Sequence, residues 1–455
     1  MPRSNRITYG QCLVLASPRP ANQDNTANLT GMKRTQAASI NFSFSRQRFK
    51  QIGSADFVGD VNVTNPDITF ATDYYYTNGT NEMLLGLNVD GAKGAALSGI
   101  RRPSQDNNFY ILFGSGIMDE VLLTDSDNLF KDNYNVTALG NCFLNSYSIS
   151  ASVGALVSVS AQVQADNISV EPYNTTVPGM SIPAIDASTS KPSATNKYRI
   201  KKSFFENTTN QDGLIPSALE PSGIKLTLPN NVNVPGLEFT GSNNRSAFIN
   251  SFTLEFSIDR TALYGFGSIY PFGRRALLPV LGSLSFSATA SEFQSGNLND
   301  LVILDNNKEA FYDFTIDMMG QSGISGARWE VQGARADSQG LSQSIGDDGS
   351  MEAKFSFSMS DASGLKFSTS PLIINQPTGT ASQGDTLYVA ATGRTSSDTS
   401  VYNADGFKYE WYKDGSLIGS SNNPSYDDAQ AGEYYVVVYN ELGTATSNGC
   451  TVDPP

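Results

Sequence analysis

Alternation of apolar and hydroxyl-bearing residues is the feature that most constrains the fold of this chain. Between residues 143 and 163, Tyr147 and Ile149 alternate with serines, and the alternation resumes after Gly154. A period of two places the apolar side chains on one face of a β-strand and the polar side chains on the other. The segment therefore predicts a β-hairpin that turns at Gly154 and has one buried and one solvated face.

Similar runs recur along most of the 455 residues, and the 40 glycines and 20 prolines suit short strands joined by turns. We therefore predict an all-β fold with few short helices. The predicted strands are Ile40–Ser45, Ile68–Tyr76, Phe109–Phe113, Tyr198–Phe205, Phe252–Ser257, Leu284–Ala288, Phe311–Ile316, Ala327–Val331 and Met351–Met359. The candidate helices are Asn81–Leu87 and Ser295–Leu304.

The second third of the chain repeats the first in outline, which indicates an internal duplication. The matched positions are Phe44 with Phe256, Phe70 with Phe286, Phe109 with Phe311, and Gly154 with Gly349. We expect a first β domain over residues 1–180, a connector rich in Pro, Asn, Ser and Thr over 181–245, a second β domain over 246–370, and a separate module over 371–455.

The chain has no histidine, and its formal net charge is −14, from 44 acidic and 30 basic residues. Without an imidazole, Ser-His-Asp and Cys-His catalysis and the commonest zinc sites are excluded. Because a net acidic protein does not neutralise phosphates, we do not expect it to bind nucleic acid tightly. An acidic surface can still let a polyanion pass without binding it. We expect no catalytic residue, no cofactor and no metal site.

Acidic residues form two patterns that are compatible with a functional site but do not single one out. Glu255, Asp259, Glu292 and Asp317 stand on or near predicted strands. A pair of such carboxylates could hydrolyse a glycoside, but solvation at the surface is the default interpretation. Asp125 begins an acidic spacing like that of a calcium loop, without the glycine and distant glutamate that complete one.

The cysteines indicate a reducing compartment of assembly. Cys12, Cys142 and Cys450 lie far apart, with neither a zinc-binding spacing nor a disulfide framework. The longest apolar run near the first residue, Cys12–Ala16, is too short for an export signal, and no stretch approaches the ~18 apolar residues of a membrane span. We expect a soluble protein made in the cytoplasm.

A basic run follows one of the predicted strands. Arg46, Arg48 and Lys50 flank Phe49, so three positive charges and an aromatic ring lie close together. In a net acidic chain this run is better interpreted as a contact with an acidic neighbouring subunit than as a contact with DNA; a solvated strand end is the simpler alternative.

The C-terminal module has the core plan of an immunoglobulin fold. Trp411 lies on one central strand, in the run Trp411–Gly415, and Tyr434 begins a later strand, in the run Ala431–Asn440. In that fold the indole fills the centre of the sandwich and the tyrosine hydroxyl ties down a corner. The module resembles the I-set type of immunoglobulin domain over about 80 residues.

The module departs from that family at the two positions where the bridging cysteines are expected, which we assign to Ala391 and Val436. An apolar pair in place of a disulfide agrees with folding in a reducing cytoplasm. The module is either an adhesive domain or a spacer displayed on a surface.

The complete chain resembles the major tail tube proteins of long-tailed bacteriophages. The resemblance rests on Ser45–Ser54, Asn65–Phe70 and Tyr74–Glu82, together with the duplicated β-rich body and the appended module. It implies a structural virion protein, assembled in the host cytoplasm into stacked rings of three or six copies that join other tail proteins. DNA would pass through the lumen without specific binding, and the immunoglobulin-like module would project outward and contact the host surface weakly.

Other classes of function remain open from the sequence. A capsid decoration protein would bind a preformed lattice and would not stack on itself. A bacterial surface adhesin would carry an export signal. A glycan-active enzyme would lose its activity when one acidic residue is replaced.

Overall fold

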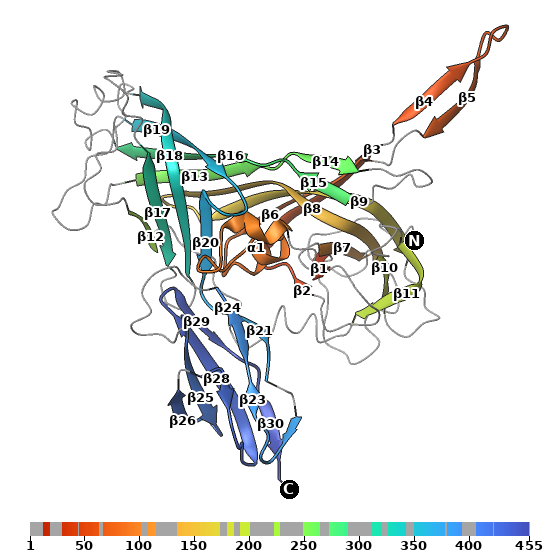
Figure 1. The fold of residues 1–455 in the computed structure, drawn as a ribbon. Coiled ribbons are helices and arrows are strands. Elements are labelled where there is room, and N and C mark those ends of the chain that lie inside the picture. Colours follow the sequence, from red (N-terminus) through yellow and green to blue (C-terminus); the bar gives the residue numbers. More distant parts are fainter. Residues whose placement is uncertain are drawn as a thin grey trace, which may run out of the picture.

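The computed structural model describes residues 12–18, 30–43, 45–62, 67–101, 107–114, 134–172, 180–185, 192–200, 223–227, 249–263, 273–289, 311–319, 326–342, 350–377, 380–393, 406–421 and 423–454. These residues form an all-β protein, as predicted. A broad sheet forms the body, and an elongated β module hangs from one side of it (Figure 1).

The first half of the body contains nine of the strands, one α-helix and one 3-10 helix. The strands are β1 Cys12–Pro18, β2 Thr30–Gly31, β3 Thr35–Ser43, β4 Arg46–Lys50, β5 Phe57–Asn62, β6 Asp67–Tyr75, β7 Asn107–Gly114, β8 Tyr134–Ser152 and β9 Ser158–Pro172. Helix α1 spans Thr80–Leu84 and the 3-10 helix η3 spans Ala96–Arg101. A small separate pair, β10 Met180–Ile185 and β11 Pro192–Ile200, follows.

The second half contains a further nine strands. They are β12 Ile224–Thr227, β13 Ile249–Ser257, β14 Arg260–Leu263, β15 Gly273–Ala276, β16 Val280–Thr289, β17 Tyr312–Met319, β18 Gly326–Ser342, β19 Ser350–Met359 and β20 Leu365–Thr369. Strands of both halves belong to one 14-stranded sheet, because β8 pairs with β13. Strand β12, which lies in the predicted connector, pairs with β17 in the same sheet.

The two halves have the same strand order. In the first half the pairing runs β3-β6-β9-β8-β7-β1, and in the second it runs β13-β16-β19-β18-β17-β12. Each half also places a hairpin between its first two long strands, β4–β5 in one and β14–β15 in the other. The division of the body at residues 181–245 stays a prediction, since the halves share a sheet.

The hydrophobic core is continuous across the body, with members from Val14 to Leu372. Trp329 of β18 is fully buried, stacks on Phe367 with ring centroids 3.9 Å apart, and lies 5.8 Å from the ring of Tyr147 of β8. Aromatic side chains from both halves therefore fill one interior, which fixes the halves against each other.

Two local predictions are confirmed. Strands β8 and β9 form the predicted hairpin, and Gly154 adopts a φ of +85° in its turn, a value that glycine reaches without strain. The predicted helix Asn81–Leu87 is α1, which ends at Leu84. The second predicted helix, Ser295–Leu304, lies outside the described residues.

The C-terminal module consists of one six-stranded sheet and two separate strand pairs. The sheet has the order β22-β30-β28-β25-β26, with β29 also paired to β28, and β22 runs parallel to β30. The other strands pair as β21–β24 and β23–β27. Their bounds are β21 Leu372–Asn375, β22 Thr380–Ser382, β23 Leu387–Tyr388, β24 Ala390–Thr392, β25 Lys408–Lys413, β26 Ser416–Ser421, β27 Ser425–Tyr426, β28 Gly432–Asn440, β29 Gly443–Thr446 and β30 Cys450–Asp453.

Polar contacts join the module to the body. The Arg328 guanidinium bonds Asp317 of the body at 2.6 Å and Glu441 of the module at 2.7 Å. The buried amide of Asn440 donates to the carbonyl oxygens of Thr369 and Gly393, both at 2.8 Å. These bonds hold the turn between β28 and β29 against the end of β20.

Candidate assembly and conduit surfaces

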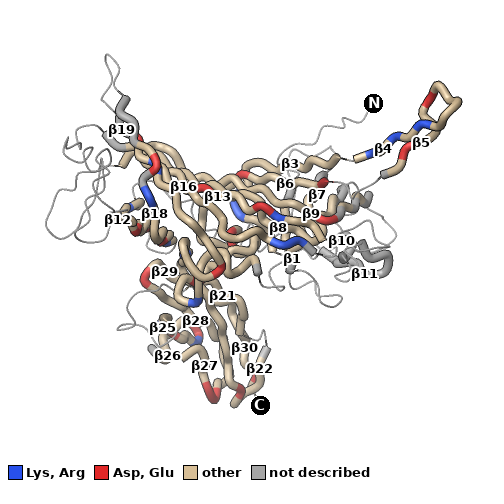
Figure 2. The backbone as a smooth tube through the Cα atoms, turned by 45° about the horizontal axis from the view of Figure 1, so that its top comes forward, with Lys and Arg blue, Asp and Glu red and all other residues tan. Residues whose placement is uncertain are grey.

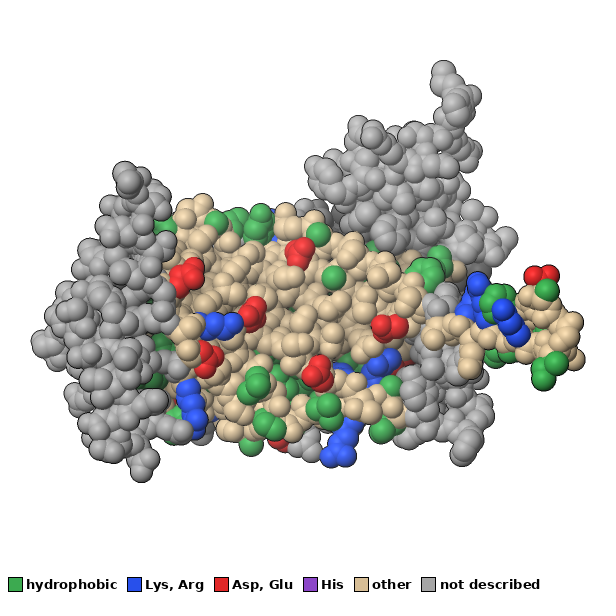
Figure 3. All heavy atoms as spheres, turned by 90° about the horizontal axis from the view of Figure 1, so that it is seen from above, with side chains coloured by type: hydrophobic (Ala, Val, Ile, Leu, Met, Phe, Trp, Pro, Cys, Tyr) green, Lys and Arg blue, Asp and Glu red, His purple; other side chains and the backbone are tan. Residues whose placement is uncertain are grey.

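One face of the 14-stranded sheet packs on the core. The opposite face, here called the polar face, carries mostly small polar side chains. Across neighbouring strands, Ser285, Thr253 and Ser150 stand in register, as do Ser283, Glu255 and Ser148. The further polar residues on the same outward positions are Ser146, Ser158, Ser160, Gln162, Gln164, Ser257, Ser287, Ser356 and Ser358. Seen from above, this polar face is broad and contains few charged groups (Figure 3).

Acidic side chains predominate among the charged residues that the structure describes on the outward positions of β6, β13, β16 and β19. Asp73, Glu255 and Glu352 occupy such positions, together with Lys354. The hydroxyl groups are partly paired with one another, as in the 3.0 Å contact between Ser150 Oγ and Ser158 Oγ. Apart from the exposed Leu281, this polar face therefore offers a polyanion little apolar surface and no array of cations to bind.

The hairpin β4–β5 projects beyond the sheet (Figure 1). Its apolar side chains are exposed: Ile52 at the tip, then Phe49, Phe57, Val58 and Val61. An isolated two-stranded hairpin is marginally stable in water, and exposed apolar clusters of this kind mark contacts with other molecules. The projecting hairpin is accordingly a candidate assembly contact.

The basic residues predicted as a subunit contact lie on this hairpin, and Figure 2 shows them along β4. The Arg46 guanidinium lies 3.9 Å from the Asp60 carboxylate, with both side chains about half exposed. Arg48 and Lys50 lie over the ring of Phe57, at 5.5 and 4.9 Å from its centroid. All three cationic groups remain accessible to a partner.

A buried carboxyl group ties the helix to the sheet. Glu82 of α1 is 1 % exposed and accepts hydrogen bonds from the hydroxyls of Tyr74, at 2.8 Å, and Tyr147, at 3.2 Å. Burial raises the pKa of Glu82 to about 7, and the two tyrosine hydrogen bonds act in the opposite direction. Sequence reasoning missed this group; its only signal is an acidic residue in a predicted helix next to a tyrosine-rich strand.

The tryptophan and tyrosine singled out in the module lie in its core. Trp411 is fully buried and its indole N–H donates to the Asn423 carbonyl at 3.4 Å. The Tyr434 hydroxyl donates to the Gln430 carbonyl at 2.8 Å and accepts the Gln430 N–H at 3.0 Å. The hydroxyl thus closes a loop of backbone four residues upstream, as a tyrosine corner does.

Val436 is fully buried, whereas Ala391 is only partly buried at the edge of the core. Leu387 and Val389, which alternate with Ala391, are both fully buried. Ala391 packs against the core cluster that contains Val436, and its assignment to the position of a bridging cysteine stays a prediction. Cys142 and Cys450 are buried and reduced; the side chain of Cys12 lies outside the described residues.

The acidic residues considered for catalysis do not converge. Asp317 is paired with Arg328, and Glu255 accepts a hydrogen bond from Ser283 on the polar face at 2.9 Å. Asp259 stands at the turn between β13 and β14, and Glu292 lies outside the described residues. No group of three Cys, Asp or Glu side chains that could hold a metal ion occurs in the part of the chain that the structure describes.

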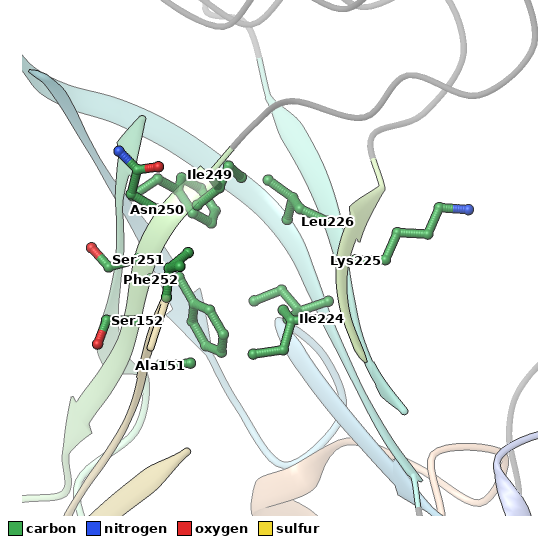
Figure 4. A pocket seen from close by; sticks show the side chains of 12 residues that line it. Ala151, Ser152, Ile224, Lys225, Leu226, Ile249, Asn250, Ser251 and Phe252 are labelled. Carbon is green, nitrogen blue, oxygen red and sulfur yellow. The ribbon is translucent and has the colours of Figure 1, made fainter. Parts of the chain in front are cut away.

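A cavity of about 130 Å³ opens between β12 and the beginning of β13 (Figure 4). Ile224, Leu226 and Phe252 line it, and Lys225 points away from it. The cavity walls are apolar with a few amide and hydroxyl groups, so they offer no acid–base pair.

No helix among the described residues is long and apolar enough to cross a membrane.

No protein-family model and no curated protein matches the sequence. Among solved structures, the chain has distant, partial similarity to the sheath/tube terminator of an extracellular contractile injection system, PVC, in its extended state. That match has 12% identity and a TM-score of 0.26, and covers 34% of this chain and 98% of that chain. The tube-terminating cap of the anti-feeding prophage matches at 14% identity and a TM-score of 0.24, over 35% of this chain and 97% of that chain.

An immunoglobulin-like structure also matches. The N-terminal Ig1-2 module of the Drosophila receptor protein tyrosine phosphatase DLAR has 13% identity and a TM-score of 0.14, over 31% of this chain and 89% of that chain. At such TM-scores the similarities are partial, and the proposals below rest on the strands and side chains already described.

Proposed function

We propose that this chain is the structural subunit of a phage tail tube. Copies assemble in the host cytoplasm into rings, the rings stack into the tail of the virion with other tail proteins, and DNA passes through the lumen into the host. No catalytic step is part of this function, and no cofactor is required.

The polar face of the sheet is the observation that carries this proposal. A conduit for DNA needs a wall that stays hydrated and does not bind phosphate, which serine hydroxyls with a few carboxylates provide. A sheet of this breadth is also compatible with a closed ring of copies. In such a ring the sheets of neighbouring copies pair at their edges, so no strand edge is left exposed.

The duplicated strand order supports a ring with few chains. Each chain supplies two halves of the same order, so three chains supply six equivalent units, whereas six chains supply twelve. A ring of three copies would have a mass of 3 × 48.8 = 146.4 kDa, and a ring of six copies 292.8 kDa. We favour the ring of three.

The projecting hairpin and the C-terminal module have separate roles in this assembly. The hairpin, with Arg46, Arg48 and Lys50 beside exposed apolar groups, contacts a neighbouring copy. The module hangs from the side of the sheet opposite the polar face (Figures 1 and 3). When the polar face lines the lumen, the module therefore lies outside, where it can contact a host surface weakly.

Negative-stain electron microscopy of the purified chain, with its mass measured in the same buffer, tests this function. Hollow rings or tubes with a mass in multiples of 146.4 kDa are expected. Dispersed monomers that coat a preformed capsid lattice without stacking on one another would instead identify a decoration protein. Monomers that neither stack nor coat a lattice would refute both structural roles.

A further inference from the structure

Among the described residues, a strand pairing joins the two halves within the chain. Strand β8 of the first half pairs antiparallel with β13 of the second, with Ser146 opposite Ser257, Tyr147 opposite Phe256, and Ile149 opposite Leu254. On its other side β8 pairs with β9 over most of its length. This contact joins two units of the same strand order in a head-to-tail manner.

The two halves correspond residue by residue in these strands. Strands β3 and β13 both have nine residues, and both ends differ by the same number: 249 − 35 = 214 and 257 − 43 = 214. The hairpins that follow begin at equivalent arginines, since 260 − 46 = 214.

Strands β8 and β18 share their irregularities. The register shift lies between Leu144 and Ser146 in β8 and between Ala336 and Ser338 in β18, so 336 − 144 = 192 and 338 − 146 = 192. A residue with positive φ precedes the shift in both strands, Asn141 in one and Gly333 in the other, and 333 − 141 = 192. A bulge at the same place in each strand fixes the correspondence more firmly than alternation does.

The repeated order leaves two strand edges without their equivalent partner in the described residues. Strand β3 pairs with β6 on one side. The 335–342 segment of β18 pairs with β19, and none of the strands that the structure describes takes the place that β13 occupies beside β8. Each edge is thus open where its counterpart in the same chain is closed.

Burial of the side chains points to the same conclusion. Phe256 of β13 is 4% exposed, whereas the equivalent Phe42 of β3 (256 − 214 = 42) is 54% exposed. Ile40, equivalent to the fully buried Leu254, is only partly buried. The inward face of β3 is therefore more exposed than that of β13, which packs beside β8.

We propose that β3 of one copy pairs antiparallel with the 335–342 segment of β18 of the next copy, and so repeats between chains the β8–β13 contact within the chain. The register follows from the two offsets: Ser43 (257 − 214) lies opposite Ser338 (146 + 192), and Ile40 (254 − 214) lies opposite Leu341 (149 + 192). The proposal rests on the proposed function, because it specifies which strands join the copies of a ring.

Charges at the two edges are compatible with this contact. Arg260, equivalent to Arg46, donates from Nε to the Leu144 carbonyl at 3.2 Å within the chain. The same relation brings Arg46 of one copy to the Ala336 carbonyl of the next, beside the exposed carboxylate of Asp337. An arginine that lies 3.9 Å from Asp60 in the single chain thereby gains a backbone acceptor and a second acidic neighbour.

Cysteine pairs test this register directly. Residues directly opposite in an antiparallel pair have Cβ atoms about 4.5–5.5 Å apart, close enough for a disulfide after small adjustments. The variant Ser43→Cys/Ser338→Cys, oxidised after assembly, is expected to form disulfides between copies. A non-reducing gel should then show species at two and three times 48.8 kDa.

Two further pairs serve as controls. Ser146→Cys/Ser257→Cys reproduces the contact within the chain and should form a disulfide without any increase in mass. Ser43→Cys/Ser356→Cys displaces the second thiol to β19 and should give little linkage between copies. Equal linkage by the Ser356 pair and the Ser338 pair would overturn the register.

A second measurement separates this proposal from the proposed function. Phe42→Asp places a charge on the exposed inward face of β3 and should abolish rings, whereas Ile374→Asp, at a residue of the module that is 59% exposed, should leave them intact. If the Phe42→Asp variant still forms rings like those of the wild type, and the Ser43→Cys/Ser338→Cys variant forms no disulfide between copies, this strand pairing is refuted but the tube function is not. A wild-type protein that stays monomeric would overturn both.

Discussion

Replacement of Glu82 by Gln should change how the stability of the body depends on pH. In the folded chain the pKa of Glu82 is raised to about 7 by burial, against 4.5 for an ordinary glutamate. Below pH 4.5 both the folded and the unfolded states hold the proton, so the group adds no pH dependence. Between pH 4.5 and 7 the unfolded state releases the proton first, and stability falls as pH rises.

The size of the loss follows from the two pKa values. A difference of 7 − 4.5 = 2.5 corresponds to roughly 3 kcal/mol, because each pH unit is worth about 1.4 kcal/mol. Above pH 7 the folded chain also holds a carboxylate, and the loss becomes constant. Glu82→Gln cannot ionise, so its stability relative to wild type should increase by that amount between pH 4 and pH 8.

Urea unfolding at a series of pH values measures this difference. Trp329 lies in the same core as Tyr147, which donates to Glu82, so its fluorescence reports the unfolding of the body. Trp411→Phe in both proteins removes the other indole signal. A difference between variant and wild type that stays flat from pH 4 to pH 8 would show that the folded state does not hold Glu82 in a dry interior.

Three further predictions concern the hairpin, the module and their attachments. Replacement of residues 47–61 by a short Gly-Ser linker should leave the thermal unfolding of the body unchanged and prevent stacking of rings in electron micrographs, since the side chains of the hairpin are exposed; normal stacking would exclude the hairpin as a contact. Tyr434→Phe should destabilise the module by about 1–3 kcal/mol in urea unfolding, because the Gln430 backbone loses its hydroxyl partner; an unchanged midpoint would contradict this role. Arg328→Ala should speed proteolysis between body and module, because the bond to Glu441 is lost; an unchanged digestion rate would mean that other contacts suffice.

Alternation in the sequence was sufficient to predict the long strands, but neither the short strands nor the exact correspondence of the two halves. The duplication was predicted with Phe44 matched to Phe256 and Phe109 to Phe311, whereas the pairing registers match Phe42 with Phe256 and Phe109 with Phe314. The first mismatch is a slip of two residues, which keeps every side chain on the same face, so alternation cannot detect it. The second is a slip of three residues, beside the register shift between Tyr312 and Phe314 of β17. Bulges and hydrogen-bonded registers, which the structure supplies, resolve the slip.

Burial could not be predicted where it depends on distant strands. Phe42 lies on the apolar face of the predicted strand Ile40–Ser45, a face that alternation predicts to be buried, yet it is exposed because β3 lies at a sheet edge. Glu82 is buried because α1 packs against β6 and β8, and its tyrosine partners are 8 and 65 residues away along the chain. The polar face, in contrast, follows directly from the alternating serines of β8 and β9.

End-on electron micrographs of the purified chain test the central claim most directly. The account predicts closed rings with a hollow centre, in which three copies produce six inner lobes from the duplicated halves and three outer lobes from the immunoglobulin-like modules. Monomers of 48.8 kDa with no rings under any assembly condition would contradict it.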